Sequence, residues 1–252
     1  MVQADARVGS EVFSTSAVNH FTNPSIIHPG QGGSAAGLDL ALVTVTELMK
    51  TASRNFSCPN CGAELEVRLQ STKLVACSYC DSNVFLEDDA VRLAGKQGVM
   101  ADYPSLIQMH GNYLYRGWQF MAVGRARFEY GQGFWDEWWV MGGDGEGRWL
   151  AVDEGDFALE ETIEIERTPS PFELAVGRSI RLNNEDLYVT EQGRALCIGV
   201  QGELPEPLKV GDSYSYFHLS APGGRIYTLE VDRGRAAFHA GHWLDPFEIE
   251  VL

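Results

Sequence analysis

Two Cys-x-x-Cys pairs constrain this chain more than any other feature. Cys58 and Cys61 form the first pair, Cys77 and Cys80 form the second, and 15 residues separate the pairs. Four thiolates at this spacing are typical of a zinc ribbon, in which two tight turns each supply two ligands to one tetrahedral ion. Because four cysteines complete the coordination of zinc, we expect a structural site with no open position for catalysis. A redox-active cysteine pair is the alternative.

The residues around the cysteines also have the pattern of a ribbon. Between the two pairs, residues 63–70 alternate apolar and charged side chains, which predicts a half-buried strand. Residues 73–76 provide the return strand, and residues 84–86 close the module. We therefore predict a zinc ribbon over residues 53–95.

The segments before the ribbon differ from it in composition. Residues 1–37 are rich in Gly, Ser, Asn and Pro, which predicts a flexible leader that cannot bury enough apolar surface to fold. Residues 38–52 carry apolar side chains at steps of three and four, which predicts a short amphipathic helix. Its apolar side either packs on the rest of this chain or docks a partner.

After the ribbon the chain is dense in short apolar runs separated by turn residues. Gly-rich stretches such as 142–147 and 222–224 are typical hairpin turns, and residues 169–171 (Pro-Ser-Pro) interrupt the pattern once. The predicted fold class is mainly β: a four-cysteine zinc ribbon followed by two tandem small antiparallel β-barrel or sandwich units, with a short N-terminal helix. The two units are predicted over residues 100–168 and 172–252.

The two predicted units also resemble each other. Gly124-Arg125-Ala126 in the first matches Gly193-Arg194-Ala195 in the second, and residues 144–155 match residues 222–234 in their order of glycine, arginine, aromatic and acidic residues. We interpret these matches as a tandem repeat of one small β unit.

A cluster of tryptophans and acids marks the first unit as a candidate binding surface. On a strand, alternate side chains point to opposite faces, so this segment carries aromatic rings and a carboxylate on each face. Either Arg125, Arg127 or Arg148 pairs with the acids inside a packed core, or one face is an open groove suited to a cationic ligand. The candidate residues are Trp135, Asp136, Glu137, Trp138, Trp139 and Trp149.

No catalytic residue is predicted. Asp136 and Glu137 are adjacent on a strand and point to opposite faces, so they cannot act on one bond. Cys197 lies in an apolar run and is expected in the core, whereas His239 and His242 lack a third ligand at metal-binding spacing. Nucleophile elbows, dinucleotide fingerprints and phosphate loops are not found in the sequence.

The net charge and the number of cysteines indicate which partners and which cellular compartment are expected. The net charge of -16 disfavours nucleic acid as a partner, because the chain as a whole repels phosphate. Four of the five cysteines belong to the ribbon, which fits a reducing cytoplasm better than a disulfide framework. We expect a cytoplasmic protein without a signal peptide or a transmembrane segment.

Several motifs occur together with the ribbon: Tyr113, Tyr115, Val123-Gly124-Arg125, Trp135-x-Glu137-Trp138, Trp149-Leu150 and Gly202-Glu203-Leu204-Pro205. With these motifs the chain resembles a bacterial family of uncharacterised β domains, catalogued as a domain of unknown function. The resemblance runs from about Phe56 to the C-terminus. Such proteins tend to be encoded near polyamine aminopropyltransferase-like and membrane-stress genes. The resemblance therefore implies association with such a system, but no activity and no catalytic residue.

Three functions remain open at this stage. The preferred hypothesis is a non-enzymatic binding or scaffold protein whose ribbon and β units bind another protein, in association with a peripheral membrane system or a polyamine system. The second is a receptor or enzyme for a small polyamine-like cation that uses the tryptophans and acids. The third is nucleic-acid binding through the ribbon, which the acidic charge disfavours.

Overall fold

The computed structural model describes residues 54–87, 90–96, 98, 100–101, 103–232 and 235–252. The predicted leader over 1–37 and the predicted helix over 38–52 lie outside the described residues. In the described part, the regular structure consists of strands and one short 3-10 helix, η1 (Pro246–Glu248). The predicted mainly-β class is confirmed. No helix in the described part of the chain is long and apolar enough to cross a membrane.

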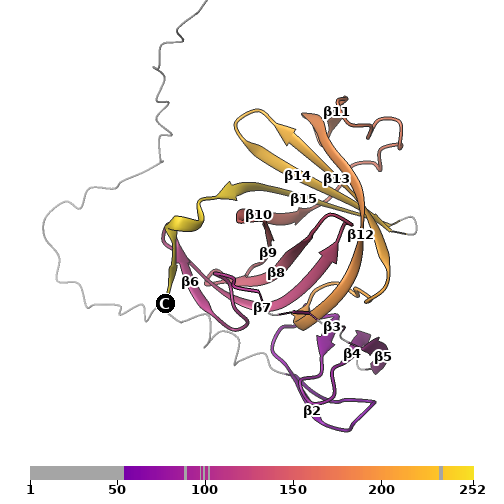
Figure 1. The fold of residues 1–252 in the computed structure, drawn as a ribbon, viewed down its shortest axis with the longest axis vertical. Coiled ribbons are helices and arrows are strands. Elements are labelled where there is room, and N and C mark those ends of the chain that lie inside the picture. The colour runs from indigo at the N-terminus through magenta and orange to yellow at the C-terminus, as the bar shows by residue number, and fades with distance from the viewer. Residues whose placement is uncertain (1–53, 88–89, 97, 99, 102, 233–234) are drawn as a thin grey trace, which may run out of the picture. The chain divides into compact units, whose positions relative to one another are not determined.

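The strands are β1 (Arg54–Ser57), β2 (Glu64–Val67), β3 (Leu74–Ala76), β4 (Ser82–Glu87), β5 (Ala90–Lys96), β6 (Asn112–Tyr115), β7 (Trp118–Glu129), β8 (Phe134–Gly142), β9 (Gly147–Asp153), β10 (Asp156–Ile163), β11 (Ser179–Leu182), β12 (Glu185–Leu204), β13 (Ser213–Ala221), β14 (Arg225–Asp232), β15 (Arg235–Leu244) and β16 (Ile249–Val251). Short turns join many of the consecutive strands, and longer segments precede β11 and β13 (Figure 1).

Two four-stranded meanders, β7–β10 and β12–β15, join into one closed antiparallel sheet. β10 pairs with β15, with Leu159 opposite His242, and β12 pairs with β7, with Val200 opposite Ala126. The resulting ring order is β7-β8-β9-β10-β15-β14-β13-β12 and back to β7. The two predicted β units are therefore not independent sheets. Each meander has two open edges, and pairing with the other meander satisfies the backbone groups of both.

The sequence matches between the two halves fall on corresponding strands. Gly124-Arg125-Ala126 lies on β7 and Gly193-Arg194-Ala195 on β12, the first strand of each meander. Arg148 lies on β9 and Arg225 on β14, the third strand of each. The tandem origin of the two halves, and the bounds 100–168 and 172–252, stay predictions.

Each meander packs on both of its faces, because a separate apolar cluster covers the outside of each. Inside the closed sheet, the rings of Trp135 on β8 and Tyr216 on β13 meet 5.2 Å apart although their strands are not neighbours. Outside β7–β10, the strands β6 and β16 cover a second cluster that includes Trp138 and Phe120. Outside β12–β15, β11 and Leu174 cover a third.

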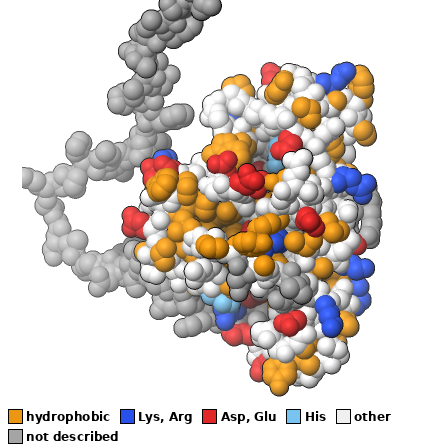
Figure 2. Space-filling model, in the orientation of Figure 1, with side chains coloured by type: hydrophobic (Ala, Val, Ile, Leu, Met, Phe, Trp, Pro, Cys, Tyr) orange, Lys and Arg blue, Asp and Glu red, His pale blue; other side chains and the backbone are white. Residues whose placement is uncertain are grey.

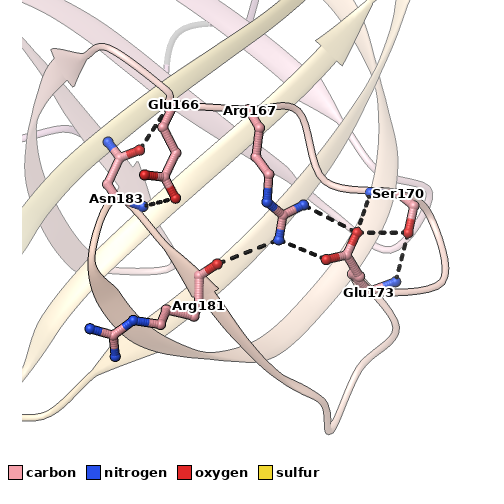
Figure 3. Close-up of polar contacts among 6 residues, drawn as sticks. All are labelled: Glu166, Arg167, Ser170, Glu173, Arg181 and Asn183. Carbon is pink, nitrogen blue, oxygen red and sulfur yellow. Dashed lines mark hydrogen bonds and ion pairs between the residues drawn. The ribbon is translucent and has the colours of Figure 1, made fainter.

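The segment from β10 to β11 is held in place by polar contacts (Figure 3). Glu173 accepts hydrogen bonds from the Arg167 guanidinium and from the backbone and hydroxyl of Ser170. The Arg167 and Ser170 donors lower the pKa of Glu173 to about 2. Nearby, the Asn183 backbone donates to Glu166 and the Glu166 backbone donates to the Asn183 side chain. These contacts fix the loop that carries Leu174 onto the outer core.

The long strand β12 connects the closed sheet to the ribbon. Its last residues, Glu203 and Leu204, pair with Val75 and Leu74 of β3, which continues into β4 and β5. A Cβ atom on Gly124 of β7 would lie 2.0 Å from the Glu203 carbonyl oxygen, so the two backbones approach closely there. Gly202 has a φ of +67°, which suits glycine at this bend.

The Glu203 carboxylate fastens the ribbon at this junction. It is buried and accepts hydrogen bonds from the backbone N–H groups of Arg68 and Leu69 and from the Thr72 hydroxyl, at 2.7 to 3.1 Å. The Lys73 N–H also donates to the Leu204 carbonyl at 2.9 Å. The Gly-Glu-Leu-Pro motif noted in the sequence therefore joins the two parts of the structure.

We expect Glu203→Ala to lower the free energy of unfolding by about 2 to 5 kcal/mol, because it leaves several buried donors without an acceptor. Urea denaturation measures the effect. The matched control is Glu87→Ala, which removes an exposed partner of Arg92 and should cost about 0 to 1 kcal/mol. Equal losses in the two variants would contradict a fastening role for Glu203.

Candidate functional site

The four cysteines of the ribbon converge on one point. Their sulfur atoms all lie within 4.8 Å of one another, with Cys58 and Cys80 3.7 Å apart and Cys61 and Cys77 3.8 Å apart. Four thiolates around a tetrahedral zinc with Zn–S bonds of about 2.3 Å would be about 3.8 Å apart. The cluster is therefore compatible with a metal site. The same distances exclude disulfide bonds between these cysteines, all of which are free.

Two similar turns place the cysteines. In the first, the Gly62 N–H donates to the Cys58 carbonyl, and in the second the Asp81 N–H donates to the Cys77 carbonyl. Gly62 and Asp81 both have positive φ, +76° and +56°, so each turn ends in a left-handed residue. Contacts with Ser82 and with Asn60, whose Nδ2 donates to the Cys80 sulfur at 3.5 Å, lower the pKa of Cys80 to about 6, which favours the thiolate form that binds metal.

The tryptophan segment lies in packed interiors on both faces of β8. Trp138, Trp139 and Trp149 are 2%, 8% and 5% exposed. Trp139 and Trp149 pack in the inner core with Trp135 beside them, and Trp138 packs in the outer core under β6. Aromatic residues occur on both faces because the closed sheet is covered on both. That these residues form a binding surface stays a prediction.

Aromatic side chains are exposed elsewhere on the surface. Trp243, at the end of β15, is 57% exposed, and Phe247 in η1 is 96% exposed. Figure 2 shows one face of the molecule, where hydrophobic side chains gather across the middle with acidic side chains among them.

Asp136 forms the predicted pairing with arginines. Its carboxylate accepts hydrogen bonds from Arg125 at 2.6 Å and from Arg127 at 2.7 and 2.9 Å, and all three side chains are buried. Arg127 also donates to the Ala101 carbonyl and stacks on the ring of Phe134 at 4.2 Å. Arg148, the third candidate partner, pairs instead with Asp144 and Glu161. The two buried arginines therefore neutralise the charge of Asp136 within the fold, which supports a structural role for this carboxylate.

Glu137, on the opposite face of β8, has a different environment. It lines a small cavity inside the closed sheet, and its carboxylate accepts one hydrogen bond, from Trp135 Nε1 at 2.8 Å. The other strands that line the cavity contribute Glu160 of β10, Glu230 of β14 and His239 of β15. Glu206, from the loop after β12, lines it as well.

Two further polar contacts of the lining residues are seen in the described part of the chain. Thr228 donates to Glu160 at 2.8 Å, and His239 Nδ1 lies 3.2 Å from the Thr162 hydroxyl. No lysine or arginine is among the described residues that line the cavity. Four glutamates therefore line one cavity of the closed sheet, and no lysine or arginine of the described residues lines it.

Three of these carboxyls, those of Glu137, Glu160 and Glu230, have pKa values above the usual range of a glutamate. Burial raises the pKa of Glu137 to about 8 and that of Glu160 to about 7, and repulsion from Glu160 and Glu206 adds to the rise at Glu137. Burial, followed by repulsion from the same group of acids, raises the pKa of Glu230 well above its usual range. Burial lowers the pKa of His239 to about 4, so the imidazole is neutral at pH 7.

A larger cleft of about 650 Å³ lies beside the cavity. One wall belongs to the ribbon and includes Lys73, Phe85 and Arg92. The other belongs to the closed sheet and includes Tyr214 and Ala237. The cavity and the cleft share Glu206, Leu208 and Glu230 as lining residues, so the two spaces meet at these side chains.

The sequence did not single out Glu160, Glu206, Glu230 or His239 as one group. They lie on separate elements of the two halves, and only closure of the sheet brings them together. A signal existed in the residues: Glu160 follows Phe157-Ala158-Leu159 without a break, and Glu230 stands between Leu229 and Val231. Cys197 is buried, as expected, and His239 is buried as well. His239 lines the cavity, whereas His242 is not among the lining residues.

Comparison with known proteins agrees with the closed sheet as the defining unit. A family model described as a domain of unknown function, DUF4178, matches residues 114–246, and the chain belongs to this family. The matched residues span all eight strands of the closed sheet and leave out the four cysteines. No match is found among curated proteins or among solved structures.

The cavity acids predict a dependence of stability on pH. A carboxyl whose pKa is raised on folding binds more protons in the folded state than in the unfolded state. Its contribution to the free energy of unfolding is fully present below its unfolded pKa of about 4.5, and it is lost as pH rises through the folded pKa. Because of Glu160, the stability of the fold therefore decreases as pH rises from about 5 to about 7. His239 acts in the opposite direction and lowers stability as pH falls from about 6.5 toward 4.

We expect the melting temperature of the wild type to fall from about pH 5 to about pH 8, and Glu160→Gln to reduce that slope because the amide does not titrate. Differential scanning calorimetry across this range is the measurement. Glu250→Gln removes an exposed carboxylate of β16 and serves as control. An identical slope in the wild type and Glu160→Gln would show that Glu160 is ionised in the folded protein.

Proposed function

We propose that this protein is a non-enzymatic binding protein in which a zinc-held ribbon and the closed sheet together form a cleft for a small ligand. The observation that carries the proposal is the cleft of about 650 Å³ whose walls come from both parts. Volumes of about 300 to 1,000 Å³ are typical of sites for small molecules.

Zinc is the metal that the cysteine cluster fits best. Four sulfur ligands, two turns of the Cys-x-x-Cys kind and the spacing of the sulfurs are characteristic of structural zinc. Cys58, Cys61, Cys77 and Cys80 would hold the ion and fill its coordination sphere. Bound zinc would supply cross-linking of the two turns and no Lewis-acid chemistry toward a substrate.

The ribbon is suited to act as a fixed wall of the cleft. The Glu203 carboxylate and the pairing of β3 with β12 attach it to the closed sheet. Phe85 and Leu86 of β4 and Arg92 of β5 line the cleft together with Leu208 and Lys209. Apolar side chains with charges of both signs around them suit a small polar ligand that carries charge.

Binding without catalysis is supported by the state of the one cysteine outside the ribbon. Burial raises the pKa of Cys197 to about 12, so its thiol is not a nucleophile at neutral pH. The proposal also requires a reducing compartment, since a metal site of four thiolates is lost on oxidation. We therefore propose the cytoplasm as the location.

For the metal, we expect one zinc per chain in the purified protein, and loss of that zinc in Cys58→Ser and Cys77→Ser. Elemental analysis by mass spectrometry measures both. Cys197→Ala is the matched control, because it removes a cysteine outside the cluster and should keep a full zinc content. Protein that contains no metal, or iron alone, would overturn the zinc assignment.

For the cleft, we expect at least one of three four-carbon probes, butane-1,4-diamine, butane-1,4-diol and succinate, to shift the amide resonances of Leu208, Lys209 and Ala237 in NMR titrations. Ala237→Trp places a large ring among the lining residues and should abolish these shifts. Glu250→Trp on β16, outside the lining, should retain them. Absence of shifts with all three probes, or shifts that persist in Ala237→Trp, would refute the cleft as the binding site.

A further inference from the structure

The cavity behind the cleft has the composition of a receptor for positive charge. Glu137, Glu160, Glu206 and Glu230 line it together with His239, and no lysine or arginine of the described chain does so. Ionised carboxylates in such a space are costly without a counter-charge. A folded protein resolves this either by keeping the acids protonated or by binding a cation.

Two side chains that are more than nine-tenths buried have polar atoms that nothing in the described structure satisfies. Glu160 is 7% exposed, and only its Oε1 accepts a hydrogen bond, from Thr228. His239 is 4% exposed, and only its Nδ1 has a partner, Thr162. Both residues line the cavity, so Glu160 Oε2 and His239 Nε2 are available to a bound group.

Glu230 strengthens the case. No hydrogen bond or ion pair to it is found among the described residues, and its charged neighbours in the cavity are the acids Glu137, Glu160 and Glu206. A carboxyl inside the sheet that accepts no hydrogen bond from the described residues can accept one from a bound group. Such a donor must be small and must carry N–H or O–H groups.

The size of the cavity limits what can enter it. The space is about 10 Å³, which accommodates one group of the size of a water molecule. The –NH₃⁺ head of a primary amine has this size and carries three donors. Its carbon chain would extend past Glu230 and Leu208 into the larger cleft, because these residues line both spaces.

Direct coordination of a metal ion fits the cavity less well. Oxygen ligands of calcium lie about 2.3 to 2.6 Å from the ion, which places them within about 5 Å of one another. Among the described residues, the cysteines are the group of three or more ligands that meets a separation of 4.8 Å. Longer N–H···O contacts and the adjacent Trp149 ring suit an organic ammonium group.

We propose that the cavity is the binding site for the ammonium head of a primary alkyl amine, with Glu137, Glu160 and Glu230 as its acceptors and the cleft as the site of its carbon chain. The inference rests on the proposed function, because the cleft is the route to the cavity. It adds the chemical class of the ligand and the residues that select it.

The test compares matched probes by isothermal titration calorimetry at about pH 8. Butane-1,4-diamine and butylamine should bind, and butane-1,4-diol and succinate should bind at least about tenfold more weakly, since charge-assisted hydrogen bonds are worth about 1.5 to 3 kcal/mol. Glu160→Gln keeps the acceptor for Thr228 and removes the charge, so it should weaken amine binding at least about tenfold. Glu250→Gln, which removes an exposed charge, should leave it unchanged.

Proton release on amine binding distinguishes a direct role of Glu160 in binding from a structural role, because a structural role would not change the number of protons released. Because the raised pKa values leave the acids partly protonated at pH 7, amine binding should release protons and its affinity should increase from about pH 6 to about pH 8. Titrations in two buffers of different ionisation enthalpy measure the release. Glu160→Gln should reduce it.

The two proposals fail in different ways. If the diol or succinate binds as well as the amines and Ala237→Trp abolishes that binding, the cleft is a binding site and the ammonium inference is wrong. Amine affinity that is unchanged in Glu160→Gln and Glu230→Gln would also contradict the ammonium inference. If none of the probes binds, the proposed function and the inference are both rejected.

Discussion

One buried carboxylate determines how the parts of this protein are joined. Glu203 stands at the end of β12, where the closed sheet meets the ribbon, and satisfies three donors from the Arg68–Thr72 turn. Such an acid is stable in the interior because two backbone N–H groups and one hydroxyl donate hydrogen bonds to its charge. The same strand pairs with β3 on one side of the junction and with β7 before it. The wall of the cleft therefore depends on this contact.

Acidic side chains of the closed sheet lie in two kinds of environment, and the proposed binding site belongs to one of them. Asp136 faces outward from β8 and meets two arginines, so its charge is neutralised within the fold. Glu137, the next residue, faces inward toward other carboxyls. One step along a strand thus separates an ion-paired carboxylate from a cavity that is lined, in the described part of the chain, by acids and by no lysine or arginine. The interior acids are the groups that a ligand can still satisfy.

The candidate site combines a four-cysteine cluster with an acidic cavity. The four sulfurs lie close enough together to be compatible with one metal ion, which they would coordinate completely. The cavity differs, because Glu160 and His239 are buried and each has a polar atom that forms no hydrogen bond with the described residues. The ribbon would hold the cleft in shape, and the closed sheet would recognise the ligand.

The sequence by itself determined the local features of this protein. The cysteine spacing predicted the cluster, and the alternation and the glycine turns predicted a mainly-β chain. The sequence also offered Arg125, Arg127 and Arg148 as partners of the acids, and the first two pair with Asp136. Only the tertiary structure decided that the two halves share one sheet and that Glu137, Glu160 and Glu230 line one cavity. Local patterns follow from backbone period and turn chemistry, whereas these groupings depend on strand pairings between residues far apart in the chain.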